Sequence, residues 1–420
     1  MSEIYSVEVP GAKSPCTKTY QTLAESADQW QLLLKNAHGK QAKCLCKGNG
    51  SKHLNIRHLK VQKRYVLARY ANTGPEHALD CRFFSEAEYR TGLQSYVEGV
   101  VVEGDEDDVT VRLSQAIQLR KKNDDAEAEA KVDLPLNPRK PGRTQRAMKL
   151  RGLLDLLWTR SNLNTWFPKM EGKRDDSILQ WKLKQTAEHI KTHRMTLDKV
   201  LLCPAQKGPK CGARNVAIVK QADRLKYRLV TVGVLMPYIE GEPVDQMQTL
   251  SLMNSKGMPT MYLNGRTWPD AQKSFGREIG AWKKGAKIIA IAFLELRQNN
   301  ARYSDVLEVA LMHVSDMLIP LDSDLEGKVE VMLREQKRKF SKPLRFDDDD
   351  KTIPDFWLND LDDEYPMEVF GMNTPEYLQR KADKVLHYQT EYSKRLGWWS
   401  WDAYQNSDVA SSPALPPATR

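Results

Sequence analysis

The chain has 420 residues, which is enough for several domains with cores of their own. Apolar residues make up 40% and charged residues 28%, and no segment approaches the roughly 18 consecutive apolar residues of a membrane helix, so a membrane protein is not expected. The formal charge of +9 favours a polyanionic partner such as nucleic acid.

The first residues, MSEIYSVEVPGAKSP, lack the basic stretch and apolar core of a secretory signal. We therefore expect a cytoplasmic protein whose six cysteines are reduced. The sequence contains no P-loop, no GxGxxG followed by an acid, no GxSxG and no HExxH, which argues against an ATPase, a dehydrogenase, a serine hydrolase and a zinc protease.

Residues 1–118 hold two pairs of soft metal ligands. Cys44 and Cys46 form a CxC pair, and His77 and Cys81 form an HxxxC pair further along the chain. Four such groups suit a closed tetrahedral zinc site of structural type. The layout loosely resembles SWIM-type zinc modules with the second pair reversed, and the alternative is four reduced, unlinked side chains. The basic segment LKVQKRYVLARY between the pairs predicts two strands.

Residues 119–147 predict a linker, because this segment combines mixed charge and three prolines with few large apolar side chains. Residues 148–205 predict a helical region in which leucine and tryptophan stripes form core; a winged-helix DNA reader is the alternative. Residues 206–319 predict a mixed α/β region, with strands at 215–219, 227–236 and 287–296 and a helix at 303–317.

Residues 320–404 place acidic side chains on elements that could converge. The motif SDLE opens an amphipathic helix carrying Glu326, although the spacing of Ser323 and Glu326 is also that of a simple capping box. Asp355 lies in a predicted strand, and Glu368 lies in the next, between apolar neighbours where an acid is costly without a partner. Carboxylates are the ligands that hard divalent cations prefer, and a nearby lysine can stabilise charge during phosphodiester cleavage.

The segments LE, PDF, EVFG and Y…K, read in that order, resemble the PD-(D/E)xK superfamily of restriction-endonuclease-like proteins. The resemblance implies that Glu326 is the first acidic position, that Asp355 and Glu368 bind Mg²⁺ or Mn²⁺, and that the catalytic lysine has moved to the following helix as Lys384, with Lys381 as the alternative. The sequence departs from the standard motif at Phe370, where that motif has lysine.

A basic stretch beside this region suggests contact with nucleic acid. Lys337, Arg338, Lys342 and Arg345 would supply the phosphate contacts. Three tryptophans in WWSW could stack on bases or, as we prefer, pack the last strand onto the core. Residues 405–420 predict a disordered tail.

Almost the whole chain is similar to an uncharacterised family of proteins carried by bacterial plasmids and integrative elements, through GLLDLLW, NTWFP, KPLRF and WWSW. This resemblance implies a mobile-element setting and a protein partner from the same element.

The sequence thus predicts an α+β multidomain protein: a small β-rich zinc-binding module, a helical middle, and a C-terminal α/β restriction-endonuclease-like domain. Two functions stay open. One is a metal-dependent DNA endonuclease. The other is a non-catalytic, zinc-containing accessory protein that binds nucleic acid and keeps a degenerate nuclease fold.

Overall fold

The computed structural model describes residues 3–59, 63–70, 73–85, 90, 100–103, 108–118, 147–175, 177–192, 195–205, 208, 210–344 and 353–419. The predicted linker and Arg345 lie outside these residues, apart from residue 147. None of the helices in this part of the chain has the length and apolar character that crossing a bilayer requires.

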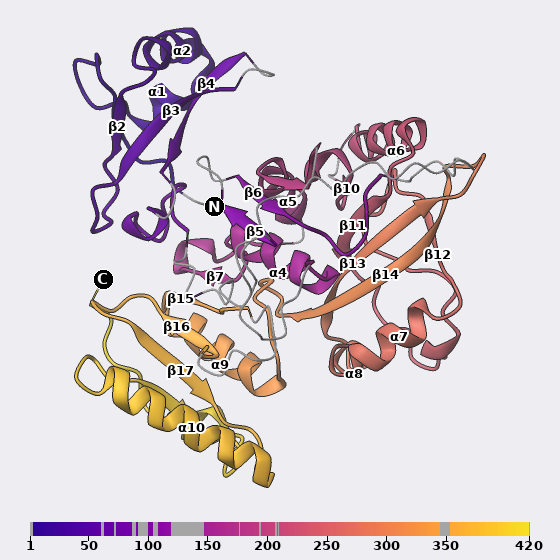
Figure 1. Cartoon of the computed structure of the whole chain (residues 1–420). Helices are drawn as coiled ribbons and strands as arrows, with labels where there is room; N and C mark the ends of the chain where they lie inside the picture. The colour runs from indigo at the N-terminus through magenta and orange to yellow at the C-terminus, as the bar shows by residue number, and fades with distance from the viewer. Residues whose placement is uncertain are drawn as a thin grey trace, which may run out of the picture.

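The N-terminal region forms a four-stranded antiparallel sheet with strands in the order β1-β2-β3-β4 (Figure 1). Trp30 and Leu34 of helix α2 share a core with Leu54 and Ile56 of β3. The structure therefore has the β-rich N-terminal module that the sequence predicts. Its elements are β1 (Val7–Glu8), α1 (Lys18–Thr22), α2 (Ala27–Asn36), β2 (Gln41–Cys44), β3 (His53–Leu59) and β4 (Arg64–Arg69).

A small sheet of order β5-β6-β8-β9 joins segments from both sides of the predicted linker, because β6 pairs in parallel with β8. The predicted boundary at residue 118 therefore does not coincide with a boundary between sheets. Helix α4 is buried almost throughout, as the leucine and tryptophan stripes predict. The elements are β5 (Val101–Glu103), β6 (Val109–Val111), α4 (Leu150–Arg160), α5 (Ser177–Glu188), β8 (Ile190–Thr192) and β9 (Met195–Thr196).

The largest core surrounds a five-stranded sheet of order β10-β11-β13-β14-β12. The antiparallel pair β13 and β14 forms its long centre, and helices α7 and α8 contact β14 (Figure 1). The elements are β10 (Leu201–Leu202), α6 (Ala213–Leu225), β11 (Leu229–Val234), β12 (Thr260–Leu263), α7 (Thr267–Ser274), α8 (Gly276–Lys283), β13 (Lys287–Leu296) and β14 (Tyr303–Val314).

Two predictions in this region are wrong. Residues 215–219 lie in helix α6, where Ile218, Val219 and Ala222 form a buried helical face. Residues 303–314 form strand β14, and the predicted helix at 303–317 does not exist. The run at 215–219 is too short for its apolar pattern to distinguish a strand from a turn of buried helix. The extended state of 303–314 depends on pairing partners that the local pattern does not show, because β14 is hydrogen-bonded to β13 on one side and to β12 on the other.

The C-terminal sheet has the order β18-β17-β16-β15-β7. Strands β15, β16 and β17 are antiparallel neighbours, and β18 returns parallel to β17 after helix α10. The edge strand β7 comes from the middle of the chain and pairs with β15. The elements are β7 (Thr165–Trp166), α9 (Asp324–Glu335), β15 (Phe340–Ser341), β16 (Phe356–Leu358), β17 (Tyr365–Val369), α10 (Pro375–Tyr392) and β18 (Trp399–Trp401).

The chain end packs on this sheet, which differs from the predicted disordered tail. The indole N–H of Trp399 donates to the carbonyl oxygen of Pro413 at 2.8 Å, and Arg338 donates to that of Pro416 at 2.8 Å. Leu415 packs against the same core. Trp399 and Trp401 are buried, so these two indoles serve packing, as we preferred over stacking on bases.

Candidate functional site

Asp355 and Glu368 come from adjoining chain segments of the C-terminal sheet. Asp355 directly precedes β16 and Glu368 lies in β17, and the antiparallel register that sets Phe356 opposite Met367 places these two acids at the next paired position. The Asp355 carboxylate accepts a hydrogen bond from the backbone N–H of Val369 at 2.8 Å. Both acids are buried, so their charges interact strongly.

Helix α10 supplies two partners to Glu368. The Nζ atom of Lys384 lies 2.7 Å from its carboxylate, and the hydroxyl of Tyr388 donates to the same oxygen at 2.7 Å. Burial raises the pKa of Glu368 to about 7, the charge of Asp355 adds to this rise, and Lys384 opposes it. Since Lys384 and Tyr388 are four residues apart, one helical face presents both.

The structure thus brings Lys384 to Glu368, as the resemblance implied, and adds Tyr388 as a partner. Lys381, the alternative lysine, instead pairs with Asp402 at 2.5 Å. The i, i+4 spacing to Lys384 was the one sequence signal that could have assigned Tyr388 to the site.

Glu326, the first acidic residue of the predicted site, forms an ion pair with Lys342. Lys342 follows β15 directly, is 1% exposed, and places its Nζ atom 2.8 Å from Glu326, 2.8 Å from Asp322 and 3.9 Å from Asp355. Burial raises the pKa of Glu326 to about 8, although Lys342 acts in the opposite direction. The hydroxyl of Ser323 also accepts from the backbone N–H of Glu326 at 3.2 Å, so Ser323 caps the helix as a capping box predicts. The reciprocal bond differs, because the Glu326 carboxylate accepts from the backbone N–H of Asp322 at 3.0 Å.

The protein offers few ligands to a divalent cation at this site. Among the described residues, no three carboxylates lie close enough to share one ion. Asp355 and Glu368 are nevertheless buried carboxyl groups, and carboxylate oxygens are the hard donors that Mg²⁺ takes from proteins. Two protein carboxylates leave the remaining coordination positions to water and to substrate oxygens, as is usual for Mg²⁺.

Two of the four residues predicted to contact nucleic acid are instead buried in ion pairs. Arg338 is 5% exposed, and Asp360 binds its guanidinium through both oxygens at 2.8 and 2.9 Å. Lys342 is enclosed by carboxylates, as described above. Neither side chain presents its charge to a phosphate, because each is already neutralised. Lys337 is exposed, and Arg345 lies outside the described residues.

The N-terminal sheet carries a second polar cluster, formed by the four predicted metal ligands. Cys44 ends β2 and Cys46 follows it, while His77 and Cys81 flank a turn that packs against them. The Sγ atoms of Cys44 and Cys81 are 3.7 Å apart, and Nδ1 of His77 lies 3.5 Å from Sγ of Cys46. All four side chains are buried, and their ligand atoms lie within 4.8 Å of one another.

The chemistry of this cluster fits zinc. Hydrogen bonds from the thiols of Cys44 and Cys81 lower the pKa of Cys46 well below its usual value, which favours the thiolate that a metal binds. The backbone N–H groups of Ala78 and Phe83 point to Sγ of Cys46 and Cys81 at 3.3 and 3.5 Å. Three sulfurs and one imidazole nitrogen supply the four ligands that a structural zinc site uses, so Cys44, Cys46, His77 and Cys81 would hold the ion in a closed site.

Comparison with known proteins gives one family. The model of the family described as a protein of unknown function, DUF1173, matches residues 19–403. A search of the curated proteins and one of the solved structures return no match. Because the match spans the zinc-type cluster, the middle region and the C-terminal sheet, the chain belongs to the DUF1173 family.

Proposed function

We propose that this protein is a divalent-metal-dependent phosphodiesterase that cuts DNA. The observation that carries the proposal is the order of the C-terminal elements: helix α9 with Glu326, a strand entered by Asp355, the neighbouring strand with Glu368, and helix α10 with Lys384. The resemblance to PD-(D/E)xK proteins predicts three acidic residues followed by a lysine on elements in this order. Their gathering in one buried polar cluster supports the proposal, since isolated surface acids would not interact in this way.

Asp355 and Glu368 would hold Mg²⁺ or Mn²⁺, and the bound ion would polarise a phosphate oxygen and lower the pKa of a water molecule. Tyr388 and Lys384 fix the Glu368 carboxylate from one side. The Lys384 ammonium, 2.7 Å from Glu368, would also stabilise negative charge that develops on a phosphate bound there. Lys342 fixes Glu326.

Phe370 does not contradict this proposal. The phenyl ring at the usual lysine position is 3% exposed and packs under the Nζ atom of Lys381, 4.8 Å from the ring centroid. The ammonium groups near the acids come from other elements, Lys384 on α10 and Lys342 after β15. A lysine on β17 is therefore not required to place positive charge beside the acids.

Cleavage assays test the proposal. Linear, nicked and single-stranded DNA are incubated with Mg²⁺ or Mn²⁺ and with the wild type, D355A, E368A or the control D383A, which removes an exposed acid beside Lys384. We expect D355A and E368A to lose activity by about 100-fold or more, because each removes a group that stabilises the transition state. Equal cutting by wild type, D355A and E368A would remove the catalytic assignment.

A specific observation also favours the second function, a non-catalytic accessory protein that binds nucleic acid and keeps a zinc-type module. Lys384 and Lys342 already neutralise Glu368 and Glu326 in buried ion pairs, so the cluster is stable without a divalent cation. Titration of the protein with Mn²⁺, followed by calorimetry, separates the two. Binding that is lost in D355A supports the enzyme, whereas DNA binding with no Mn²⁺ site supports the accessory protein.

The setting of a mobile genetic element and a protein partner from the same element belong to this proposal as well. They rest on the resemblance in sequence, and the excess of basic residues supports a nucleic-acid partner for either function.

A further inference from the structure

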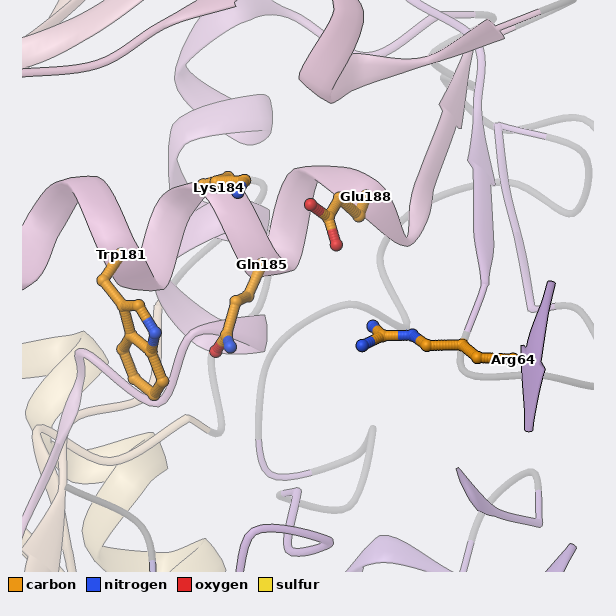
Figure 2. A pocket seen from close by; sticks show the side chains of 5 residues that line it. All are labelled: Arg64, Trp181, Lys184, Gln185 and Glu188. Carbon is orange, nitrogen blue, oxygen red and sulfur yellow. The ribbon is translucent and has the colours of Figure 1, made fainter. Parts of the chain in front are cut away.

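A cavity of about 510 Å³ lies between strand β4 and helix α5, far along the chain from the acidic cluster. Figure 2 shows the side chains that line it. One comes from the first residue of β4 and the others from consecutive turns of α5; they are Arg64, Trp181, Lys184, Gln185 and Glu188.

The fold explains why α5 presents these residues. Leu179, Leu183 and Ala187 are buried on one side of the helix and anchor it to the main core. Residues 181, 184, 185 and 188 therefore fall on other sides of α5, at helical spacing, and stay available to a ligand. In Figure 2 the guanidinium of Arg64 extends from β4 toward α5.

Within the described residues, side-chain contacts join the N-terminal module to the middle region. Lys169 pairs with Asp80 at 3.3 Å, and the side-chain amide of Asn162 donates to the carbonyl oxygen of Phe84 at 3.4 Å. Asp80 directly precedes Cys81 of the metal cluster. These contacts join the module that contains β4 and Arg64 to the region that contains α5.

The lining has the chemistry of a strand-binding surface. The indole of Trp181 is 39% exposed, which is unusual for so large an aromatic group. The Nζ atom of Lys182 lies over one face of the ring, 5.7 Å from its centroid, so a base would stack on the opposite face and lie close to this additional cation. Arg64 and Lys184 form no ion pair with any residue in the described part of the chain, so both charges are available. An exposed aromatic face beside unpaired cations is the arrangement on which unstacked bases and their phosphates bind.

We propose that this cavity binds single-stranded nucleic acid, with a base stacked on Trp181 and phosphates held by Arg64 and Lys184. The amide of Gln185 can pair with a base edge, and Glu188 can accept from an exocyclic amino group while keeping phosphates on the side of the cations. The inference rests on the proposed function in one respect, that nucleic acid is the partner; it does not depend on catalysis.

Fluorescence anisotropy tests this site with a labelled single-stranded 12-mer of mixed sequence and the full-length D355A protein without added Mg²⁺. We expect the further change W181A to weaken binding by about 5- to 150-fold, the range for loss of one base–aromatic stack. W181F keeps an aromatic face and should stay within about threefold of the D355A parent.

The salt dependence tests the two cations separately. The double change R64A/K184A should reduce the slope of log K against log salt by about 1.4, because each neutralised phosphate of a single strand contributes about 0.7. K220A/R224A removes the same charge from exposed positions of helix α6 and should leave the slope unchanged.

Unchanged binding by W181A would overturn the proposal, and so would equal weakening by W181A and W181F, since the effect would then not be stacking. Displacement of the oligonucleotide by polyglutamate as readily as by unlabelled oligonucleotide would also overturn it, in favour of an acidic protein partner. Failure of DNA cleavage would leave these readouts unaffected, because binding is measured in D355A without Mg²⁺. The two proposals can therefore fail independently.

Discussion

Replacing Lys342 with methionine should destabilise the C-terminal sheet more than any change of surface charge. The change K342M keeps most of the side-chain volume but removes an ammonium that lies 2.8 Å from Glu326, where the two side chains are only 2% and 6% exposed. Where Glu326 is ionised, which its pKa of about 8 places above pH 8, removing its partner typically costs about 3–5 kcal/mol, because the remaining charge is left without compensation.

The loss should grow with pH. Glu326 already has its pKa raised to about 8 with Lys342 present, so without the ammonium it would keep its proton to still higher pH. At pH 6 Glu326 is neutral, and burying it beside Met in place of Lys342 costs little. At higher pH the folded K342M protein must either bury an ionised Glu326 or keep this residue protonated although the solution favours its ionised form, and both lower the free energy of unfolding. K342M should therefore lie closer to wild type at pH 6 than at pH 9, above the wild-type pKa of Glu326.

Thermal unfolding at both pH values, followed by tryptophan fluorescence without added divalent metal, measures this effect. The double variant K342M/E326Q removes the uncompensated charge and should recover most of the lost stability. The control K394M, at an exposed position after α10, should stay within about 0.5 kcal/mol of wild type. A K342M protein as stable as K394M at pH 9 would refute the reasoning.

Three further predictions concern other parts of the chain. Metal analysis of purified protein should find about one zinc per chain, and C46S should lose it while C211S, outside the cluster, retains it. Because Glu326 and Glu368 have pKa values raised from 4.5 to about 8 and about 7, their contribution to stability should decline as pH rises through this range. The glutamine variants E326Q and E368Q should flatten that dependence in thermal unfolding curves, and an unchanged curve would contradict the burial of charge. R338M should lower the free energy of unfolding by about 3–5 kcal/mol, measured by denaturant titration, because it leaves a buried carboxylate unpaired.

The sequence predicted the acids of the C-terminal cluster because acidic residues in apolar strands are costly and therefore conspicuous. Asp355 and Glu368 each stood out against apolar neighbours, and Lys384 followed at the spacing that the resemblance expects. The four ligands of the N-terminal cluster were predictable for a similar reason, since thiol and imidazole pairs are rare in exposed loops.

Lys342 could not be assigned in the same way. It lies in a run of basic residues that resembles a solvated surface, and only tertiary packing shows that its ammonium is enclosed by carboxylates. The prediction that Arg338 contacts phosphate is wrong for the same reason. Its partner Asp360 is distant in sequence and lies in a loop, so the local pattern does not reveal the ion pair. Burial of a charged side chain depends on its partner, and a local pattern does not show the partner.

The edge strand β7 ties the C-terminal sheet to a distant part of the chain. The backbone carbonyl oxygen of Asn164, next to β7, accepts from the backbone N–H of Lys342 at 2.8 Å, and the side-chain amide of Asn164 donates to the carbonyl oxygen of Lys342 at 2.8 Å. A fragment beginning near residue 320 would thus lack β7, the strand that completes its sheet. It would also lack the two hydrogen bonds with Asn164 that orient the backbone of the buried Lys342. The last hundred residues therefore do not form an independent domain, and a fragment or fusion protein designed to contain the acidic cluster must also contain the segment around Asn164.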